Sequence, residues 1–230
     1  MEEQVSRLVD KAWGKLQTTP ENQRLLIGIA GIPGSGKTTL ASLLTARLNA
    51  KSPSSTVYIP MDGYHFTRAH LSSMPDPVTA HARRGAAFTF DALAFLALVR
   101  ALREPITPES TPVYAPSFDH AVKDPKADDI EILPSHCAVV VEGNYLALDE
   151  DVWRDAAHLF DELWFVEVDF EVAKRRLIKR HIAAGIAEDE AAAEQRAMEN
   201  DLVNGKEIVE KRLNVDEVIE SRMDDGWVHG

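Results

Sequence analysis

Residues 25–38 read LLIGIAGIPGSGKT, and this stretch decides the fold. Residues 25–30 form a continuously apolar run, which is typical of a short buried strand. The residues from Gly31 to Thr38 then match the pattern G-x-x-x-x-G-K-S/T in full. A helical pattern follows and continues to Leu48. A strand, a glycine-rich loop and a helix in this order predict the opening βα unit of an α/β fold.

The loop has the residue types that hold the phosphates of a nucleotide. Its glycines let successive backbone N–H groups point at a phosphate, and the following helix offers its positive end to the same anion. Lys37 is expected to reach the β and γ phosphates, and the Thr38 hydroxyl to bind Mg²⁺. A glycine-rich turn that binds nothing is the alternative, but the flanking strand and helix favour an ATP and Mg²⁺ site. The expected nucleotide contacts are Gly31, Ile32, Pro33, Gly34, Ser35, Gly36, Lys37, Thr38 and Thr39.

Strand-like and helix-like segments alternate along the rest of the chain. Residues 139–141 are valines without polar alternation, which is typical of a parallel sheet covered on both faces. We therefore expect a three-layer, doubly wound α/β fold of the type found in P-loop nucleoside triphosphate hydrolases. Strands are expected over 25–30, 56–60, 138–141, 163–168 and 215–219, and helices over 90–103, 170–184 and 188–212.

Two segments depart from this alternation. Residues 1–22 are expected to form a docking helix ahead of the main domain over 23–230, with a partner-binding helix as the alternative. Residues 104–134 contain prolines that break any long helix, so we expect an extended excursion over the sheet edge, near the acceptor site. The apolar face of the first helix would contain Val5, Leu8, Val9, Ala12, Trp13 and Leu16.

Composition and charge exclude several classes of protein. The chain has 25 Lys and Arg against 37 Asp and Glu, a formal net charge of −12, which argues against binding to nucleic acid. The longest apolar run, 92–99, is far shorter than the ~20 residues of a membrane span, so no membrane partner is expected. The acidic first residues do not resemble a leader, and we expect a cytoplasmic protein. Cys137 is the only cysteine and is expected to be a buried thiol.

Two carboxylates follow predicted strands. Asp62 comes just after strand 56–60 and Glu142 just after strand 138–141. Ligands of open α/β sheets bind outside the carboxyl ends of the strands, so both side chains are expected near the phosphates. Asp62 can accept the proton of an attacking hydroxyl, and Glu142 can hold a water on Mg²⁺ or steer the acceptor. Thr38, Asp62 and Glu142 are the expected metal-site residues, although both carboxylates also precede a glycine and are compatible with simple turns.

Further motifs follow the loop in order: MDGYHF (61–66), RRGAAFTFD (83–91), VYAPSFDHAVKDP (113–125), VVVEGNYLALDEDVW (139–153) and RLIKRH (176–181). Together with the loop they resemble the phosphoribulokinase/uridine kinase family of P-loop kinases. The sequence is more narrowly similar to its pantothenate-kinase-like branch, which includes proteins labelled fructose-transport kinase. The resemblance spans roughly residues 25–221.

This resemblance implies an enzyme, a kinase that uses ATP and Mg²⁺ to phosphorylate a hydroxyl of a small metabolite. The acceptor would be a nucleoside, a pantothenate-like alcohol or a sugar. It implies that Asp62 is the catalytic base, that Glu142 lies near metal and acceptor, and that Lys37 is also catalytic. It further implies a helical lid over 176–200 in which Arg176 and Arg180 close over the transferring phosphoryl group. A solvated helix face is the alternative for these arginines.

The resemblance also indicates the acceptor pocket. Arg83 could pair with an anionic acceptor group, with an exposed surface arginine as the alternative. Phe118 stands where uridine kinases carry the tyrosine of P-x-Y-D-F, which weakens a uridine assignment. Residues 199–201 and Asn204 resemble the N-D-x-x-N ending of the pantothenate-kinase-like branch and are expected to face the pocket. The expected substrate residues are His65, Arg83, Tyr114, Phe118, Asp119 and Tyr145.

A nucleotide-dependent regulatory or assembly ATPase without a small-molecule acceptor is the alternative function. A kinase forms a phosphorylated metabolite in step with ADP, whereas a switch protein releases free phosphate. The sequence lacks the N-K-x-D signature of GTPases but does not otherwise choose between ATP and GTP. It also leaves the identity of the acceptor and a homodimer open.

Overall fold

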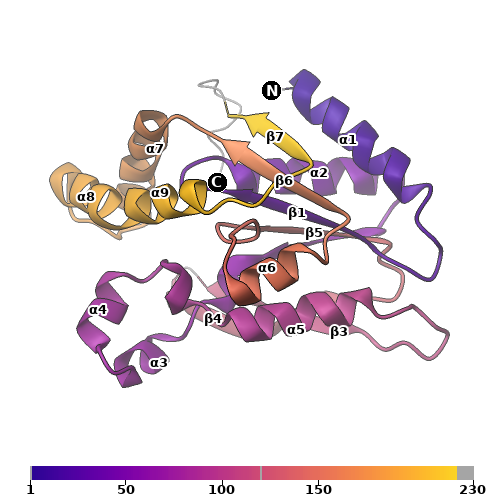
Figure 1. Ribbon diagram of the computed structural model, residues 1–230, viewed down its shortest axis with the longest axis horizontal. Coiled ribbons are helices and arrows are strands. Elements are labelled where there is room, and N and C mark those ends of the chain that lie inside the picture. Colours follow the sequence, from indigo (N-terminus) through magenta and orange to yellow (C-terminus); the bar gives the residue numbers. More distant parts are fainter. Residues whose placement is uncertain (1, 120, 222–230) are drawn as a thin grey trace.

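The computed structural model describes residues 2–119 and 121–221 of the chain (Figure 1). Its central sheet is parallel, with the strand order β2-β5-β1-β6-β7. The expected doubly wound α/β fold is therefore confirmed. The strands are β1 (Leu25–Gly31), β2 (Thr56–Pro60), β5 (Ala138–Gly143), β6 (Glu162–Glu167) and β7 (Glu217–Glu220).

The middle of the sheet is buried on both faces. Every residue of β1 is buried, and this strand pairs with β5 on one side and β6 on the other. Successive side chains point to opposite faces of a strand, so Leu26 belongs to one apolar cluster and Ile27 to the other. The absence of polar alternation in β1 and β5 follows from this double burial.

Helices cover both faces of the sheet. One cluster contains Phe95 of α5 (Ala92–Arg103) and Trp153 of α6 (Asp151–Ala157). The other contains Leu44 of α2 (Lys37–Lys51) and Leu8 of α1 (Glu2–Leu16). The expected N-terminal helix thus forms, and it buries Val5, Leu8, Val9 and Ala12 against the same face as α2.

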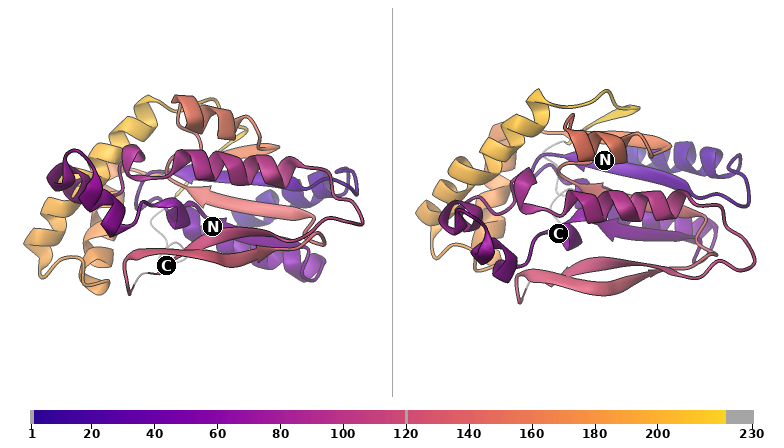
Figure 2. Two further views of the ribbon diagram at one scale, coloured as in Figure 1. Left: turned by 90° about the horizontal axis from the view of Figure 1, so that it is seen from below. Right: turned by 60° about the horizontal axis from the view of Figure 1, so that its bottom comes forward.

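The excursion over 104–134 contains an antiparallel hairpin that the sequence did not predict. It consists of β3 (Val113–Asp119) and β4 (Asp124–Ile132), which form a sheet of their own. Figure 2 shows this hairpin running along one edge of the molecule, apart from the central sheet. The strand β3 packs closely on the turn that follows β2: a Cβ added to Gly63 of this turn would lie 2.2 Å from the carbonyl oxygen of Pro116.

The segment between β2 and α5 consists of short turns of helix. It contains η1 (Met61–Tyr64), α3 (Arg68–Ser73), α4 (Pro77–Ala82) and η2 (Ala87–Thr89). Side chains cap two of these helices, α3 and α4, and also the following α5, because Thr67, Asp76 and Asp91 each accept a hydrogen bond from a backbone N–H in the first turn.

The C-terminal half of the described chain follows the prediction with one difference. The helix α7 (Phe170–Ala183) matches the expected 170–184. The helix expected over 188–212 is present over 190–210, but a π-helical turn η3 (Ala197–Asp201) lies inside it, between α8 (Glu190–Arg196) and α9 (Leu202–Glu210). The last nine residues of the expected main domain, 222–230, lie outside the described residues.

The expectation of a buried Cys137 is wrong: the residue is exposed and lies just before β5, which begins at Ala138. Its thiol donates to the carbonyl oxygen of Ser135 at 3.4 Å.

Within residues 2–119 and 121–221, no helix has the length and apolar character needed to cross a membrane.

Candidate active site

The glycine-rich loop joins β1 to α2 at the carboxyl edge of the sheet. Gly34 and Gly36 have φ values of 80° and 92°, a left-handed conformation that favours glycine. No side chain caps α2 at Gly36, so the N–H groups of its first turn face the loop. The hydroxyl oxygen of Ser35 is buried and has no hydrogen-bond partner in the described chain. These groups form a cradle of donors of the kind that binds phosphate.

Glu142, at the end of β5, is the buried carboxylate of the site, with 4% of its surface exposed. Its Oε1 atom accepts hydrogen bonds from the Thr38 hydroxyl at 3.2 Å and from the Tyr58 hydroxyl at 3.0 Å. Burial raises the pKa of this carboxyl above its ordinary value, although the nearby Lys37 ammonium acts to lower it. The pairing of Pro60 with Glu142 places the ends of β2 and β5 side by side.

The second oxygen of Glu142 indicates a place for a cation. Oε2 is buried and accepts no hydrogen bond within the described residues, a costly arrangement unless a ligand satisfies it. The Thr38 hydroxyl lies beside the same carboxylate. Mg²⁺ prefers oxygen ligands and takes one or two carboxylates together with water and phosphate oxygens. The residues present therefore fit Mg²⁺. The described residues hold no cluster of three or more metal-binding side chains that could replace those phosphate oxygens.

Several of the charged residues predicted for the site lie around Lys37. Burial lowers the pKa of its ammonium, and the carboxylates of Glu142 and Asp62 act in the opposite direction. Arg180 is close enough to lower this pKa further, and Asp201 is close enough to raise it. The structure thus brings Lys37, Asp62, Glu142 and Arg180 to one place, together with Asp201 of the segment expected to face the pocket.

Asp62 lies in η1, immediately after β2, and is half-buried. Its carboxylate makes no hydrogen bond to the described residues, so it can accept one from an acceptor hydroxyl. Its backbone carbonyl oxygen lies 2.9 Å from Nδ1 of His65. The His65 ring contacts the rings of Phe90 and Phe118, with centroid distances of 3.9 and 5.2 Å. His65 is therefore held beside the expected base.

The two arginines expected in a lid occupy different places. Arg176 of α7 donates to the carbonyl oxygens of Gly34 and Ser35, at 3.1 and 3.4 Å, and to the Ser221 hydroxyl at 2.8 Å. This arginine therefore holds the backbone of the phosphate loop. Arg180, one helical turn later, is exposed and acts electrostatically on Lys37. Contact of either side chain with a transferring phosphoryl group stays a prediction.

Arg83 is not the exposed surface arginine that was the alternative, because it is half-buried and bonded at two points. Its Nε donates to Asn200 Oδ1 at 3.0 Å and its Nη2 to Asn204 Oδ1 at 2.6 Å. Nearby, the Tyr145 hydroxyl donates to the carbonyl oxygen of Gly85 at 2.6 Å. The expected substrate residues Arg83 and Tyr145 therefore lie close together, near the two asparagines.

The hairpin residues are dispersed. The Tyr114 hydroxyl donates to Glu131 across the hairpin at 2.9 Å, and the Asp119 carboxylate accepts from the N–H groups of residues 121 and 122. Phe118 faces Arg84, whose guanidinium carbon is 5.7 Å from the ring centroid. Of the three, Phe118 is the one that lies next to His65.

A cavity of about 590 Å³ lies between α5 and the hairpin. Its lining includes His65, Tyr114, Ala97 and Pro116, but neither Asp62 nor Lys37. The cavity therefore lies beside the turn that carries Asp62, since Gly63 and Tyr64 of that turn also line it.

Several residues of the site were missed by sequence reasoning. Tyr58 is on β2 and bonds Glu142, which lies 84 positions away. His181 is buried and its Nε2 lies 2.8 Å from the carboxylate of Asp201. Arg84 binds Asp124 of the hairpin and the carbonyl oxygen of Phe66, at 2.8 and 3.0 Å. Each contact joins residues far apart in sequence, and no local pattern signals it.

Comparisons with known proteins extend well beyond the loop. A sequence model of the Phosphoribulokinase / Uridine kinase family matches residues 26–203. An ATP-dependent kinase-like protein of Aspergillus versicolor is 53% identical over 159 residues, which are 69% of this chain and 92% of that protein. A Schizosaccharomyces pombe protein provisionally named uridine kinase is 41% identical over 198 residues, 86% of this chain and 83% of that protein. A crystal structure from Silicibacter sp. TM1040, provisionally described as a fructose transport system kinase, has a TM-score of 0.79 and 33% identity and covers 92% of this chain and 98% of its own.

Proposed function

Because this chain belongs to the phosphoribulokinase/uridine kinase family of P-loop kinases, we propose that it transfers the γ-phosphoryl group of ATP to a hydroxyl of a small metabolite. One observation carries the proposal: the phosphate cradle, the buried Glu142 and the carboxylate of Asp62, which makes no hydrogen bond to the described residues, lie together at the carboxyl edge of the sheet. A nucleotide and an acceptor would come together at this edge.

The residues divide the work of phosphoryl transfer. The backbone of the loop and the Lys37 ammonium would bind the phosphates and offset their charge. Thr38 and Glu142 would hold Mg²⁺, which when bound neutralises charge on the phosphate oxygens. Asp62 would orient the acceptor hydroxyl and take its proton as the hydroxyl oxygen bonds to the γ phosphorus and the bond to the bridging oxygen of ADP breaks. Arg180 would add positive charge near the transferring group.

The acceptor belongs to the class of small alcohols: nucleosides, pantothenate-like alcohols and sugars. The names of the relatives described above do not agree on one acceptor, since the Schizosaccharomyces pombe protein is named for uridine and the Silicibacter structure for a fructose transport system. Phe118, beside His65, stands where uridine kinases carry a tyrosine, which disfavours uridine. Use of ATP rather than GTP, a cytoplasmic location and a homodimer stay predictions.

The test is a metabolite panel in which ADP formation and phosphorylated product are measured together, the product by mass spectrometry. We expect one small alcohol to give product in step with ADP. Lys37→Ala should abolish both, because the loop then lacks the charge that holds the β and γ phosphates. Release of free phosphate at the same rate with every metabolite would instead support the regulatory or assembly ATPase and overturn the kinase proposal.

A further inference from the structure

Arg83 carries a positive charge that its partners do not neutralise. Its two hydrogen bonds go to amide oxygens, those of Asn200 and Asn204, and amides are uncharged. Among the described residues it forms no ion pair with a carboxylate, whereas its neighbour Arg84 pairs with Asp124 at 2.8 Å. A half-buried guanidinium without a counter-charge favours the approach of an anion.

The two asparagines form a clamp that fixes the guanidinium. They are 3% and 1% exposed and lie four positions apart, on one face of the helix. Asn200 is in the π-helical turn η3, and its amide nitrogen donates to the carbonyl oxygen of Arg84 at 3.1 Å, which turns Oδ1 toward Arg83. π-helical turns inside helices are frequent at functional sites. The clamp uses Nε and Nη2, and it leaves Nη1 without a hydrogen bond to the described residues.

This clamp lies against the phosphate loop. Gly205 follows Asn204, and a Cβ added to Gly205 would be 3.3 Å from Cβ of Ile32, so α9 packs directly on the loop. On the other side, the Tyr145 hydroxyl joins Gly85 to the chain that follows β5. Arg83 is therefore held at the same edge of the sheet as Glu142 and the loop. Figure 1 shows α8 and α9 beside the end of the sheet that this loop occupies.

We propose that Arg83, presented by Asn200 and Asn204, is an oxyanion-binding residue of the phosphoryl-transfer site. This inference rests on the proposed function and deepens it. The planar guanidinium would donate to oxygens of a phosphate or carboxylate group. The anion has two sources, the phosphoryl group in transfer or an anionic group of the acceptor, and the two are separated by experiment.

The first titration probes the phosphoryl group. Calorimetry measures the affinity of the full chain for Mg·ADP, with and without aluminium fluoride, which stands for the phosphoryl group in transfer. Arg83→Gln removes the charge and keeps an amide donor toward the asparagines. We expect the variant to bind Mg·ADP as tightly as the unmodified chain does. The increase in Mg·ADP affinity that aluminium fluoride produces should be smaller by about 10-fold to 100-fold, as for a lost hydrogen bond to a charged group.

Arg196→Gln is the matched control. Arg196 joins α8 to the same segment by donating to the carbonyl oxygens of Ala82 and Arg84, at 2.9 Å each. Arg196→Gln weakens the contact between α8 and this segment but leaves Arg83, the proposed anion-binding residue, in place. The variant should therefore keep the effect of aluminium fluoride. Asn204→Asp keeps Arg83 and supplies the missing counter-charge, and it should lose the effect as Arg83→Gln does. This second variant also serves if Arg83→Gln folds poorly.

The second titration probes an acceptor anion. Inorganic phosphate is titrated into the complex with Mg²⁺ and a non-hydrolysable ATP analogue, in which the γ position is filled. Loss of phosphate binding in Arg83→Gln with an unchanged fluoride effect would assign Arg83 to the acceptor, and the reverse would assign it to the phosphoryl group. Equal behaviour of Arg83→Gln and Arg196→Gln in both titrations would overturn the inference. Failure of the unmodified chain to bind Mg·ADP would overturn the proposed function instead.

Discussion

The carboxylate of Asp62 is the group on which the proposed transfer depends most. Asp62→Asn keeps the size of the side chain but removes its ability to take a proton. We expect kcat to fall by about 10²- to 10⁴-fold, the usual contribution of a general base. Mg·ADP affinity should stay nearly unchanged, because Lys37 and the loop are intact. Steady-state kinetics with the acceptor found in the panel, together with calorimetry, measure the two effects.

The control for this variant makes the same chemical change at a distant place. Asp10 lies on the exposed face of α1, with 74% of its side chain accessible, and Asp10→Asn should leave both kcat and Mg·ADP affinity unchanged. Full turnover by Asp62→Asn would show that another group takes the proton.

Tyr58 is expected to position Glu142 for the metal. Its hydroxyl donates to Oε1 at 3.0 Å, which leaves Oε2 directed away from this bond. Tyr58→Phe should therefore weaken Mg²⁺ binding by about 10-fold, as other outer-shell changes do. The measurement is the Mg²⁺ concentration that half-saturates ADP binding, followed by fluorescence of a labelled ADP. Tyr114→Phe removes a hydroxyl that bonds the exposed hairpin residue Glu131 and should not change this concentration.

The sequence predicted the placement of residues that a local pattern defines, and it missed contacts between distant residues. Lys37 and Thr38 are fixed by a contiguous motif, and Asp62 and Glu142 by their position after apolar strands. The clamp on Arg83 joins residues 117 and 121 positions apart, so no window of sequence contains it.

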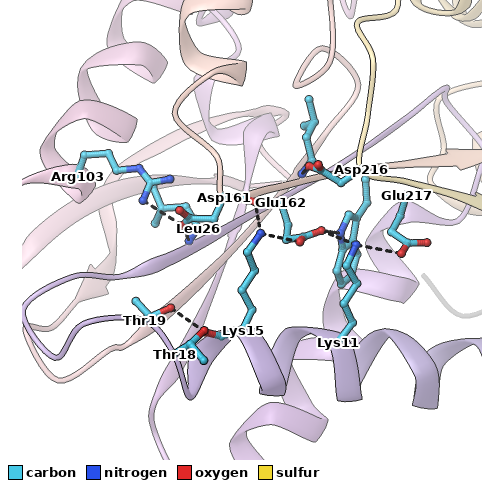
Figure 3. A network of polar contacts seen from close by, with 12 residues as sticks. Lys11, Lys15, Thr18, Thr19, Leu26, Arg103, Asp161, Glu162, Asp216 and Glu217 are labelled. Atoms are coloured by element: carbon cyan, nitrogen blue, oxygen red, sulfur yellow. Dashed lines mark hydrogen bonds and ion pairs between the residues drawn. The ribbon is translucent and has the colours of Figure 1, made fainter.

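At the scale of elements, a polar seam fastens α1 to the sheet. Figure 3 shows Lys11 and Lys15 of α1 directed at Glu162, the first residue of β6. The Nζ atoms lie 2.8 and 2.7 Å from the carboxylate, which also accepts from the indole of Trp164 at 2.7 Å. The apolar face of α1 and this buried carboxylate together hold the helix in place.

Removing the charge of this seam should destabilise the fold. Glu162→Gln removes the carboxylate that Lys11 and Lys15 share, and we expect the free energy of unfolding to fall by about 1.5–3 kcal/mol, the range for hydrogen bonds to charged groups. Urea unfolding followed by circular dichroism measures the change. Glu171→Gln is the control: this carboxylate of α7 is exposed, with 69% of its side chain accessible, and its loss should change stability little. An unchanged midpoint in Glu162→Gln would mean that apolar contacts alone hold α1.

The elements found from sequence are those whose burial is simple. Apolar runs buried on both faces predicted β1 and β5, and helical spacing predicted α1 and α5. The strand β4 reads DPKADDIEI and is exposed along most of its length, so no apolar period indicated it. The π-helical turn was missed because helix propensity is continuous through 197–201, and the partners of Asn200 lie on a different segment.

At the scale of the whole molecule, a net charge of −12 coexists with a cluster of cations at one edge of the sheet. Arg180 lies near enough to Lys37 to act on its charge, and Arg83 is held beside the loop by its hydrogen bond to Asn204. The negative charge of the remaining surface disfavours long polyanions, and the local cations select a small one. The charge balance that argues against nucleic acid therefore agrees with a site for a nucleotide.

At low pH, the ion pairs that join α1 to the strands β6 and β7 should weaken first. Burial would raise the pKa of Glu162, but hydrogen bonds from Lys11, Lys15 and Trp164 outweigh it and hold the pKa below its ordinary value. Hydrogen bonds from Arg7 and Lys11 likewise lower the pKa of Glu217, 210 positions from Arg7. The folded chain thus binds these protons less tightly than the unfolded chain does. Their stabilisation is present above about pH 4.3, the ordinary value for glutamate, and is lost as the pH falls through the lowered values.

Glu142 acts with the opposite sign, since its pKa is raised and its contribution is lost as the pH rises through that value. It therefore cannot cause a loss of stability in acid. We expect the urea midpoint of the unmodified chain to fall steeply below about pH 4.3. Glu162→Gln, which has no carboxyl to titrate at the centre of the seam, should fall less steeply although it is less stable at neutral pH. Parallel curves for the two proteins between neutral and acidic pH would place the acid-sensitive carboxylates elsewhere in the fold.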